Sequence, residues 1–89
     1  MVSETVVIES ALGVHLRPAT AMCDQAVRFK SKIHFTYKDG KTANAKSVIS
    51  ILASGIRCGE QIEIVAEGPD EEEALRAIVK AFKESLMND

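Results

Sequence analysis

Apolar and polar residues alternate along three short stretches of the chain. Alternate side chains of a β-strand point to the same face, so this period of two predicts strands with one buried face. The pair Asp39-Gly40 after the second stretch is typical of a hairpin turn, because glycine accepts a positive φ without steric cost. A return strand is therefore expected directly after the turn. The predicted strands are Glu4–Glu9, Lys32–Lys38, Lys41–Asn44 and Gln61–Glu67.

Apolar residues recur at every third or fourth position in two longer stretches, which predicts amphipathic helices. The first begins at Pro18, which suits the first turn of a helix because its missing N–H is not needed there. Asp70 is expected to cap the second helix, with Glu73 three residues later in a box-like arrangement. The predicted apolar stripes are Ala19, Met22, Cys23, Ala26 and Phe29 in the first helix and Leu75, Ile78, Val79, Phe82 and Leu86 in the second.

A third, shorter helix is predicted between Ser47 and Gly55. The hydroxyl of Ser47 can accept a hydrogen bond from a backbone N–H that lacks an intrahelical partner, and glycine commonly ends helices. The apolar residues of this helix cover too much of its circumference to form one core-facing stripe, so some of them are expected to be exposed. These residues are Val48, Ile49, Ile51 and Leu52.

These elements follow the order β-α-β-β-α-β-α along 89 residues, which is the length of one domain. The chain is too short to cover both faces of a sheet with three helices. The economical arrangement is an α+β fold, with one mainly antiparallel sheet of four strands and three helices packed on one face. We expect a single domain over residues 1–89, with one small core and no deep catalytic cleft.

Composition and charge argue against several classes of protein. The formal net charge is −2, whereas nucleic-acid binding needs a surplus of clustered Lys and Arg. Cys23 and Cys58 lie far apart and neither belongs to a Cys-x-x-Cys pair, so we expect two reduced thiols and no zinc site. No signal-peptide pattern is present, and no apolar run approaches the roughly 18 residues that a membrane span needs. We expect a cytoplasmic protein that does not bind nucleic acid or insert into a membrane.

The stretch GVHLRPAT, residues 13–20, combines three features that suit a phosphate group. The leading N–H groups of a helix have no intrahelical partner, which makes a helix start an anion site. The guanidinium of Arg17 is always charged and can make two hydrogen bonds to phosphate oxygens. His15 lies just before the helix, where a neutral imidazole can act as a nucleophile or a base. From the residues alone, His15 either handles phosphate or is a loop histidine without a special role; a metal site and a Ser–His triad are weaker interpretations.

The same stretch resembles the active-site motif G-[hydrophobic]-H-x-R-P-A of the histidine-containing phosphocarrier (HPr) family of the bacterial phosphoenolpyruvate:sugar phosphotransferase system. The matching residues are Gly13, Val14, His15, Arg17, Pro18 and Ala19. The likeness covers essentially the whole chain and implies the family's open-faced β-sandwich.

The resemblance also implies a phosphocarrier without a cofactor, not an enzyme. Enzyme I would pass a phosphoryl group to Nδ1 of His15, forming a pros-phosphohistidine, and the A-domain of a sugar-specific Enzyme II would receive it. Arg17 and the helix start at Leu16, Arg17 and Pro18 would stabilise the phosphate.

The resemblance assigns a regulatory role to a second position. The stretch KSVISILASG resembles the family's signature around a serine that HPr kinase/phosphorylase modifies in many bacteria, so Ser47 is a candidate phosphorylation site as well as an N-cap. A phosphate there would add about two negative charges and oppose binding of an acidic partner. Leu16 departs from the family, in which small residues are common at this position, and it would widen the apolar surface beside His15.

The over-apolar short helix and the resemblance together predict a partner-binding patch around His15, because exposed apolar patches with a charged rim commonly bind proteins. Its predicted members are Leu16, Thr20, Val48, Ile49 and Leu52. We expect a monomer that binds Enzyme I and A-domains of Enzyme II, with HPr kinase/phosphorylase and regulatory proteins as further candidate partners.

Two alternatives to the sugar-branch carrier stay open at this point. One is a regulatory protein-binding module, in catabolite or nitrogen control, that acts mainly through Ser47 or through docking; relatives of that kind lack the active-site histidine. The other is a nitrogen-branch carrier with the same chemistry and different partners. The second histidine, His34, is expected to face solvent on the open side of the sheet, with no catalytic role.

Overall fold

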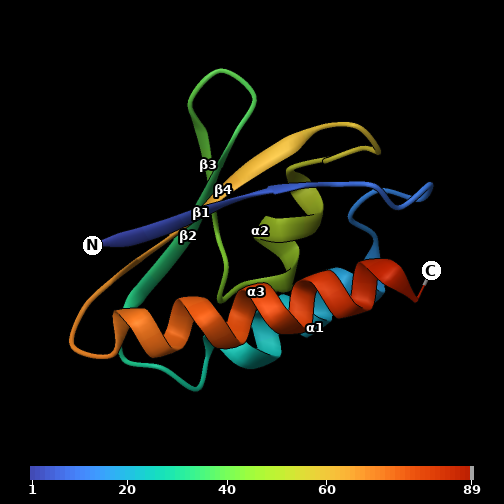
Figure 1. The fold of residues 1–89 in the computed structure, drawn as a ribbon. Coiled ribbons are helices and arrows are strands. Elements are labelled where there is room, and N and C mark those ends of the chain that lie inside the picture. The colour runs from blue at the N-terminus through green and yellow to red at the C-terminus, as the bar shows by residue number, and fades with distance from the viewer. Residues whose placement is uncertain (89) are drawn as a thin grey trace.

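The computed structural model describes residues 1–88 and shows the elements in the predicted order (Figure 1). The strands are β1 (Val2–Val7), β2 (Lys32–Tyr37), β3 (Lys41–Asn44) and β4 (Gln61–Glu67), and the helices are α1 (Leu16–Ala26), α2 (Val48–Ala53) and α3 (Glu71–Met87). Neighbouring strands follow the order β1-β4-β2-β3, and each neighbouring pair is antiparallel. The predicted α+β arrangement is confirmed.

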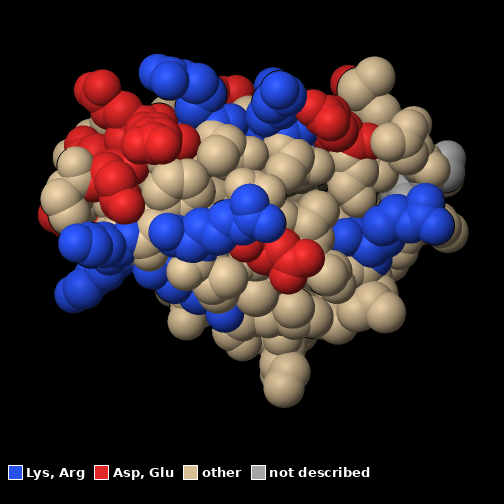
Figure 2. Space-filling model, turned by 90° about the horizontal axis from the view of Figure 1, so that it is seen from below, with Lys and Arg blue, Asp and Glu red and all other residues tan. Residues whose placement is uncertain are grey.

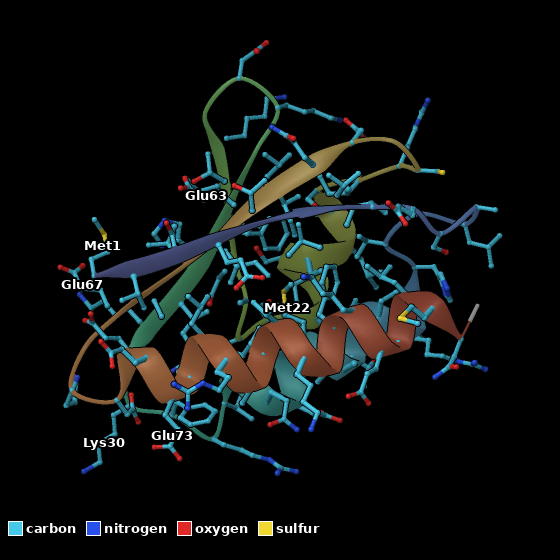
Figure 3. All side chains as sticks on the ribbon, viewed as in Figure 1. Met1, Met22, Lys30, Glu63, Glu67 and Glu73 are labelled. Carbon is cyan, nitrogen blue, oxygen red and sulfur yellow. The ribbon has the colours of Figure 1, made fainter. Side chains whose placement is uncertain are left out.

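The helices pack on one face of the sheet and leave the other face open (Figure 1). Side chains of the two central strands, such as Phe35 and Ile64, alternate toward the helices and are buried. Met22 of α1 lies between the helices and the sheet (Figure 3). On the open face, the Ser3 hydroxyl donates to the Glu63 carboxylate at 3.1 Å. The apolar stripe predicted for α3 is confirmed, since Leu75, Ile78, Val79, Phe82 and Leu86 are all buried.

The first strand begins and ends two residues before the predicted range Glu4–Glu9. Val6 and Ile8 do share a buried face, as predicted. The regular pairing of β1 with β4 nevertheless ends after Val7. The Ile8 carbonyl accepts from the N–H of Gly59 at 2.7 Å, whereas the N–H of Glu60 donates within its own loop, to the carbonyl of Arg57. β2 ends one residue earlier than predicted, because the residue that follows it has a positive φ of 48° and starts the hairpin turn.

Helix α1 also differs from its predicted bounds at both ends. It begins at Leu16 rather than Pro18, so the proline is its third residue, where a missing N–H is still tolerated. It ends at Ala26, so Phe29 of the predicted stripe lies beyond the helix, although its half-buried ring still packs against the core. Of the other stripe residues, Ala19, Met22 and Ala26 are buried and Cys23 is half-buried.

The prediction that the Asp70 side chain caps α3 is wrong. Asp70 occupies the N-cap position, but its carboxylate accepts hydrogen bonds from the loop after α1 instead, from the Ser31 hydroxyl at 2.5 Å and from the backbone N–H groups of Lys30 and Ser31 at 2.9 Å each. The Ser31 hydroxyl and these N–H groups stabilise the ionised form, which lowers the pKa of Asp70 to about 2. The expected box with Glu73 is also absent; Glu71 accepts from the N–H of Gly68 at 3.1 Å. Asp70 therefore ties the end of α1 to the start of α3.

Candidate functional site

The loop before α1 is held against the connection between α2 and β4. Gly13 has a φ of +67°, and a Cβ at this position would lie 2.5 Å from the carbonyl oxygen of Ile56 and 2.9 Å from the Cα of Arg57. The N–H of Val14 donates to the same Ile56 carbonyl at 3.0 Å, and the Val14 side chain is buried. Only glycine can bring the backbone this close in this conformation. The contact fixes the two residues that precede His15.

His15 is the N-cap residue of α1. Its backbone is extended, with φ −100° and ψ −166°, and its carbonyl accepts the first intrahelical hydrogen bond from the N–H of Ala19 at 3.1 Å. Its side chain makes no capping hydrogen bond to the helix and is partly exposed. The imidazole therefore emerges at the positive end of the helix dipole, where negative charge is favoured.

Arg17 lies in the first turn of α1, close to the end of α3. Its exposed guanidinium donates through Nη1 to the backbone carbonyl of Asn88 at 3.5 Å. This contact is long for a hydrogen bond and involves a neutral acceptor, whereas a guanidinium–phosphate pair is charge-assisted and stronger. Arg17 is thus lightly held at the same helix start as His15 and can turn toward an anion there. Pro18, the next residue, is buried and anchors this turn.

The short helix α2 packs against α1 and exposes apolar side chains. Ile49 is 82% exposed and Leu52 is 39% exposed, while Ile51 points into the core. This confirms that the apolar residues of α2 divide between core and solvent. Figure 2, which views the helical side from below, shows a broad surface without Lys, Arg, Asp or Glu in its lower part. Of the other predicted patch members, Leu16 is 62% exposed and Thr20 and Val48 are half-buried.

Ser47 caps α2 as predicted. Its Oγ accepts from the N–H of Ser50 at 3.1 Å, and its side chain is half-buried. The adjacent Lys46 reaches back to the loop after α1, where its Nζ donates to the carbonyl of Phe29 at 2.8 Å. The start of α2 is therefore fixed relative to α1, with Ser47 two residues from the exposed Ile49.

The remaining candidate groups lie away from this region. His34 is half-buried, opposite Val65 and Asn44 on the open face of the sheet. Cys23 and Cys58 are both free thiols in the structure. Among the described residues, no three His, Cys, Asp or Glu side chains cluster so as to hold a metal ion, and no helix is long and apolar enough to cross a membrane.

The contributions of Ile56 and Asn88 were not predicted from the sequence. Both act through backbone carbonyls and both come from distant parts of the chain, so no local residue pattern marks them. The only signal in the sequence was Gly13, because a glycine suggests a backbone with positive φ. The sequence does not show that this glycine lies against Ile56.

Comparison with known proteins decides the family. The model of the PTS-HPr family, described as "PTS HPr component phosphorylation site", matches residues 2–84. The chain belongs to the HPr family of phosphocarriers. The resemblance stated from GVHLRPAT is thereby confirmed, and with it the chain's membership of a phosphotransferase-system family.

Individual relatives agree with this assignment. The chain is 43% identical over 83 residues to the phosphocarrier protein HPr of Treponema pallidum, covering 93% of each chain. It is 38% identical over 88 residues to the phosphocarrier protein NPr of Escherichia coli, covering 99% of this chain and 98% of the relative. The crystal structure of HPr-C-His from Thermoanaerobacter tengcongensis superposes with a TM-score of 0.88 at 36% identity, covering 100% of this chain and 99% of the other.

Proposed function

We propose that Nδ1 of His15 accepts a phosphoryl group from phospho-Enzyme I and passes it to the A-domain of a sugar-specific Enzyme II. The observation that carries the proposal is the position of His15 as N-cap of α1, with its side chain not used for capping and Arg17 two residues further on. Family membership supports the class of chemistry. The chain would be a covalent intermediate in the transfer, not an enzyme with its own substrate cleft.

The transfer itself needs a neutral imidazole and a place for the phosphate charge. The phosphorus–nitrogen bond of the donor's phosphohistidine breaks as the bond to Nδ1 of His15 forms, and the donor nitrogen leaves with its electron pair. The phosphate then lies beside the leading N–H groups of α1, at Leu16 and Arg17, while the buried Pro18 keeps this turn in place. The guanidinium of Arg17 exchanges the Asn88 carbonyl for a phosphate oxygen. Positioning and electrostatics suffice for such a phosphoryl exchange.

We assign partner binding to the patch formed by Leu16, Thr20, Val48, Ile49 and Leu52. Three of these, Leu16, Ile49 and Leu52, are among the exposed large apolar residues of the described chain. They lie on α1, which begins directly after His15, and on α2, which packs against α1. An uncharged surface of this kind supports docking of Enzyme I and of an acceptor domain, whose contact would exclude water during transfer. Since both partners must reach the same histidine, they would bind in turn.

Ser47 is proposed as a regulatory site for HPr kinase/phosphorylase. Phosphorylation would remove the hydroxyl from its present use as N-cap and would add negative charge two residues before Ile49. Docking of an acidic partner on the patch would then weaken. A regulatory module that acts chiefly through this serine remains the second candidate function, and the exposure of Ile49 beside Ser47 is the observation in its favour.

The carrier proposal is tested with Enzyme I and labelled phosphoenolpyruvate. The wild-type chain should take up acid-labile, base-stable label, and His15→Ala should take up none. His34→Ala is a matched control, because it removes the other histidine, on the sheet, and should label normally. Label that persists in His15→Ala, or is absent from the wild type with an active Enzyme I, would refute the proposal. Onward transfer to sugar-branch or nitrogen-branch acceptors then distinguishes the two carrier roles.

A further inference from the structure

Exposed apolar side chains gather at two places on the molecule. Among the described residues, eight large apolar side chains are exposed. Three of them belong to the docking patch on α1 and α2, and three others border one groove between the end of β1, the loop that follows it and the end of α3. Single exposed apolar residues are ordinary, but several around one hollow indicate an interaction surface. The groove residues are Val7, Leu12 and Met87, which are 50%, 69% and 83% exposed.

The groove combines apolar walls with a few polar groups. Its volume is about 700 Å³, and the buried Leu86 lines it together with Leu12 and Met87. Lys83 also borders it, but the Nζ of this lysine is paired with the Glu4 carboxylate at 3.3 Å. An apolar centre inside a polar rim is the usual composition of a protein–protein interface. The groove therefore suits an uncharged, apolar group.

The groove is continuous with the candidate site. Leu12 lies three residues before His15, so their Cα atoms are at most about 11 Å apart. On the α3 side, Asn88 follows Met87, and its carbonyl accepts from Nη1 of Arg17 at 3.5 Å. Figure 1 shows that the loop after β1, the start of α1 and the end of α3 meet at one end of the molecule. A standard interface covers about 800 Å² of each protein, a disc of about 16 Å radius, so a protein bound at His15 reaches the groove.

The exposure of the groove walls favours a protein over a small molecule as the occupant. Small-molecule sites bury about 70–90% of the surface of their ligand. Leu12 and Met87 keep most of their surface in solvent, so a small molecule between them would stay largely exposed. Within the described chain, the groove also offers no buried, unpartnered polar atom to orient such a ligand. A protein surface that covers the whole groove removes more of this apolar area from water.

We propose that the groove takes an apolar side chain of phospho-Enzyme I, beside the phosphohistidine that faces His15. The proposal rests on the carrier function and adds a second contact for the phosphoryl donor. α2 packs against β3, whereas the groove lies at β1, on the opposite edge of the sheet. The groove thus extends the docking surface away from the patch residues of α2.

The donor fits the groove better than the acceptor does, because of Arg17. The contact between Arg17 and the Asn88 carbonyl joins the end of α3 to the start of α1, and so it holds one side of the groove in place. In the proposed transfer, Arg17 exchanges this carbonyl for a phosphate oxygen. The donor therefore meets the groove while this contact is made, and the acceptor meets it after the contact has been given up.

Leu12 is accordingly assigned as a residue that determines specificity for the donor. An apolar contact that forms on binding and persists through the transfer stabilises the complex and the transition state equally. Its loss therefore raises KM and leaves kcat unchanged. Loss of a residue that merely held His15 in place would lower kcat instead, so the two roles are separable by kinetics.

Steady-state labelling of His15 by Enzyme I and labelled phosphoenolpyruvate tests the proposal. Leu12→Gln and Met87→Gln keep the size of the side chain and its lack of charge but remove apolar surface. Leu12→Gln should raise the KM of Enzyme I for the chain about tenfold and Met87→Gln about threefold, with kcat within about twofold of wild type. Val27→Gln is the matched control and should leave KM unchanged, because Val27 is 57% exposed directly after α1, outside both the groove and the patch. Onward transfer from the phosphorylated variants to an A-domain should keep the wild-type rate.

Urea unfolding and the control variant keep the result interpretable. All three variants should unfold at the wild-type midpoint, because exposed side chains contribute little to stability. If the wild type takes up no label from an active Enzyme I, the carrier function fails and this proposal fails with it. If the wild type is labelled and Leu12→Gln keeps the wild-type KM, the groove proposal alone is overturned. An equal rise in KM with Val27→Gln, or a loss confined to onward transfer, also overturns it.

Discussion

Replacing Gly13 by alanine should both destabilise the fold and impair phosphorylation of His15. An alanine at a φ of +67° costs about 1–2 kcal/mol relative to glycine. Its Cβ would also lie 2.5 Å from the Ile56 carbonyl oxygen and 2.9 Å from the Arg57 Cα, which are backbone atoms that cannot rotate away. Overpacking of this kind adds about 1–3 kcal/mol. The expected loss in free energy of unfolding is therefore about 2–5 kcal/mol.

Gly55→Ala separates the two contributions. Gly55 has nearly the same φ, +64°, but a Cβ there would meet nothing within 4 Å. Urea unfolding followed by circular dichroism should show a loss of about 1–2 kcal/mol for Gly55→Ala and a clearly larger loss for Gly13→Ala. Equal losses would mean that the contact with Ile56 does not constrain the loop.

The same pair of variants links the loop to function. If the contact with Ile56 positions His15, then Gly13→Ala should slow labelling by Enzyme I about 10- to 100-fold under conditions where the variant is still folded, because small displacements of a reacting group cost rate steeply. Gly55→Ala should label almost normally. A folded Gly13→Ala protein with the wild-type rate would refute the positioning argument.

Three further changes have defined outcomes. Arg17→Lys keeps the charge but loses the paired hydrogen bonds to phosphate, so labelling of His15 should slow about tenfold while the free energy of unfolding, measured in urea, stays within about 0.5 kcal/mol of wild type. Ile49→Glu should raise the KM for Enzyme I in a steady-state labelling assay without changing stability, because Ile49 is 82% exposed; an unchanged KM would remove it from the docking patch. Asp70 has a folded pKa of about 2 against an ordinary value of 3.8, so its contribution to stability is present above about pH 4 and is lost as the pH falls toward 2. Asp70→Asn should flatten the decline in urea midpoint between pH 4 and pH 2, and an unchanged decline would show that Asp70 does not cause it.

Local residue patterns predicted most of the elements because those elements depend on nearby residues. The bounds of β4 and β3, the Ser47 cap and the apolar stripe of α3 each follow from spacing within one segment. The C-terminal ends of β1 and α1 differ from the prediction, and tertiary hydrogen bonds lie just beyond both. Gly59 ends the ladder of β1, and the Asp70 carboxylate captures the backbone just beyond α1.

Asp70 shows why a correct local rule can give a wrong contact. A carboxylate at an N-cap can accept hydrogen bonds from the N–H groups of its own helix or from donors elsewhere in the fold. The neighbouring sequence shows only the first set. The loop at Lys30 and Ser31 offers two N–H groups and a hydroxyl, a better set than one helical N–H. Nothing near Asp70 in the sequence indicates that this loop lies beside it.

In the candidate site too, the local features were predicted from the sequence and the tertiary contacts were not. The chemistry of His15 and Arg17 was predicted from eight consecutive residues. The backbone carbonyls that contact this stretch, Ile56 at Val14 and Asn88 at Arg17, come from the α2–β4 connection and the end of α3. A backbone carbonyl is present at every residue, so its identity carries no signal. Only the assembled fold shows which carbonyls meet the loop.

The contact between Arg17 and Asn88 bears on how a carrier can release its phosphate. An exposed guanidinium is hydrogen-bonded to water or to the protein before any phosphate arrives, so its interaction with phosphate counts only as the difference between the two states. In the proposed transfer, Arg17 would exchange water and the Asn88 carbonyl for a phosphate oxygen, and only the difference between these acceptors would favour the phosphorylated form. The exposed position of the guanidinium reduces that difference further, since water screens the new charge pair. On the proposed function, a site built in this way would hold phosphate with a small net free energy, as an exchange between two proteins requires.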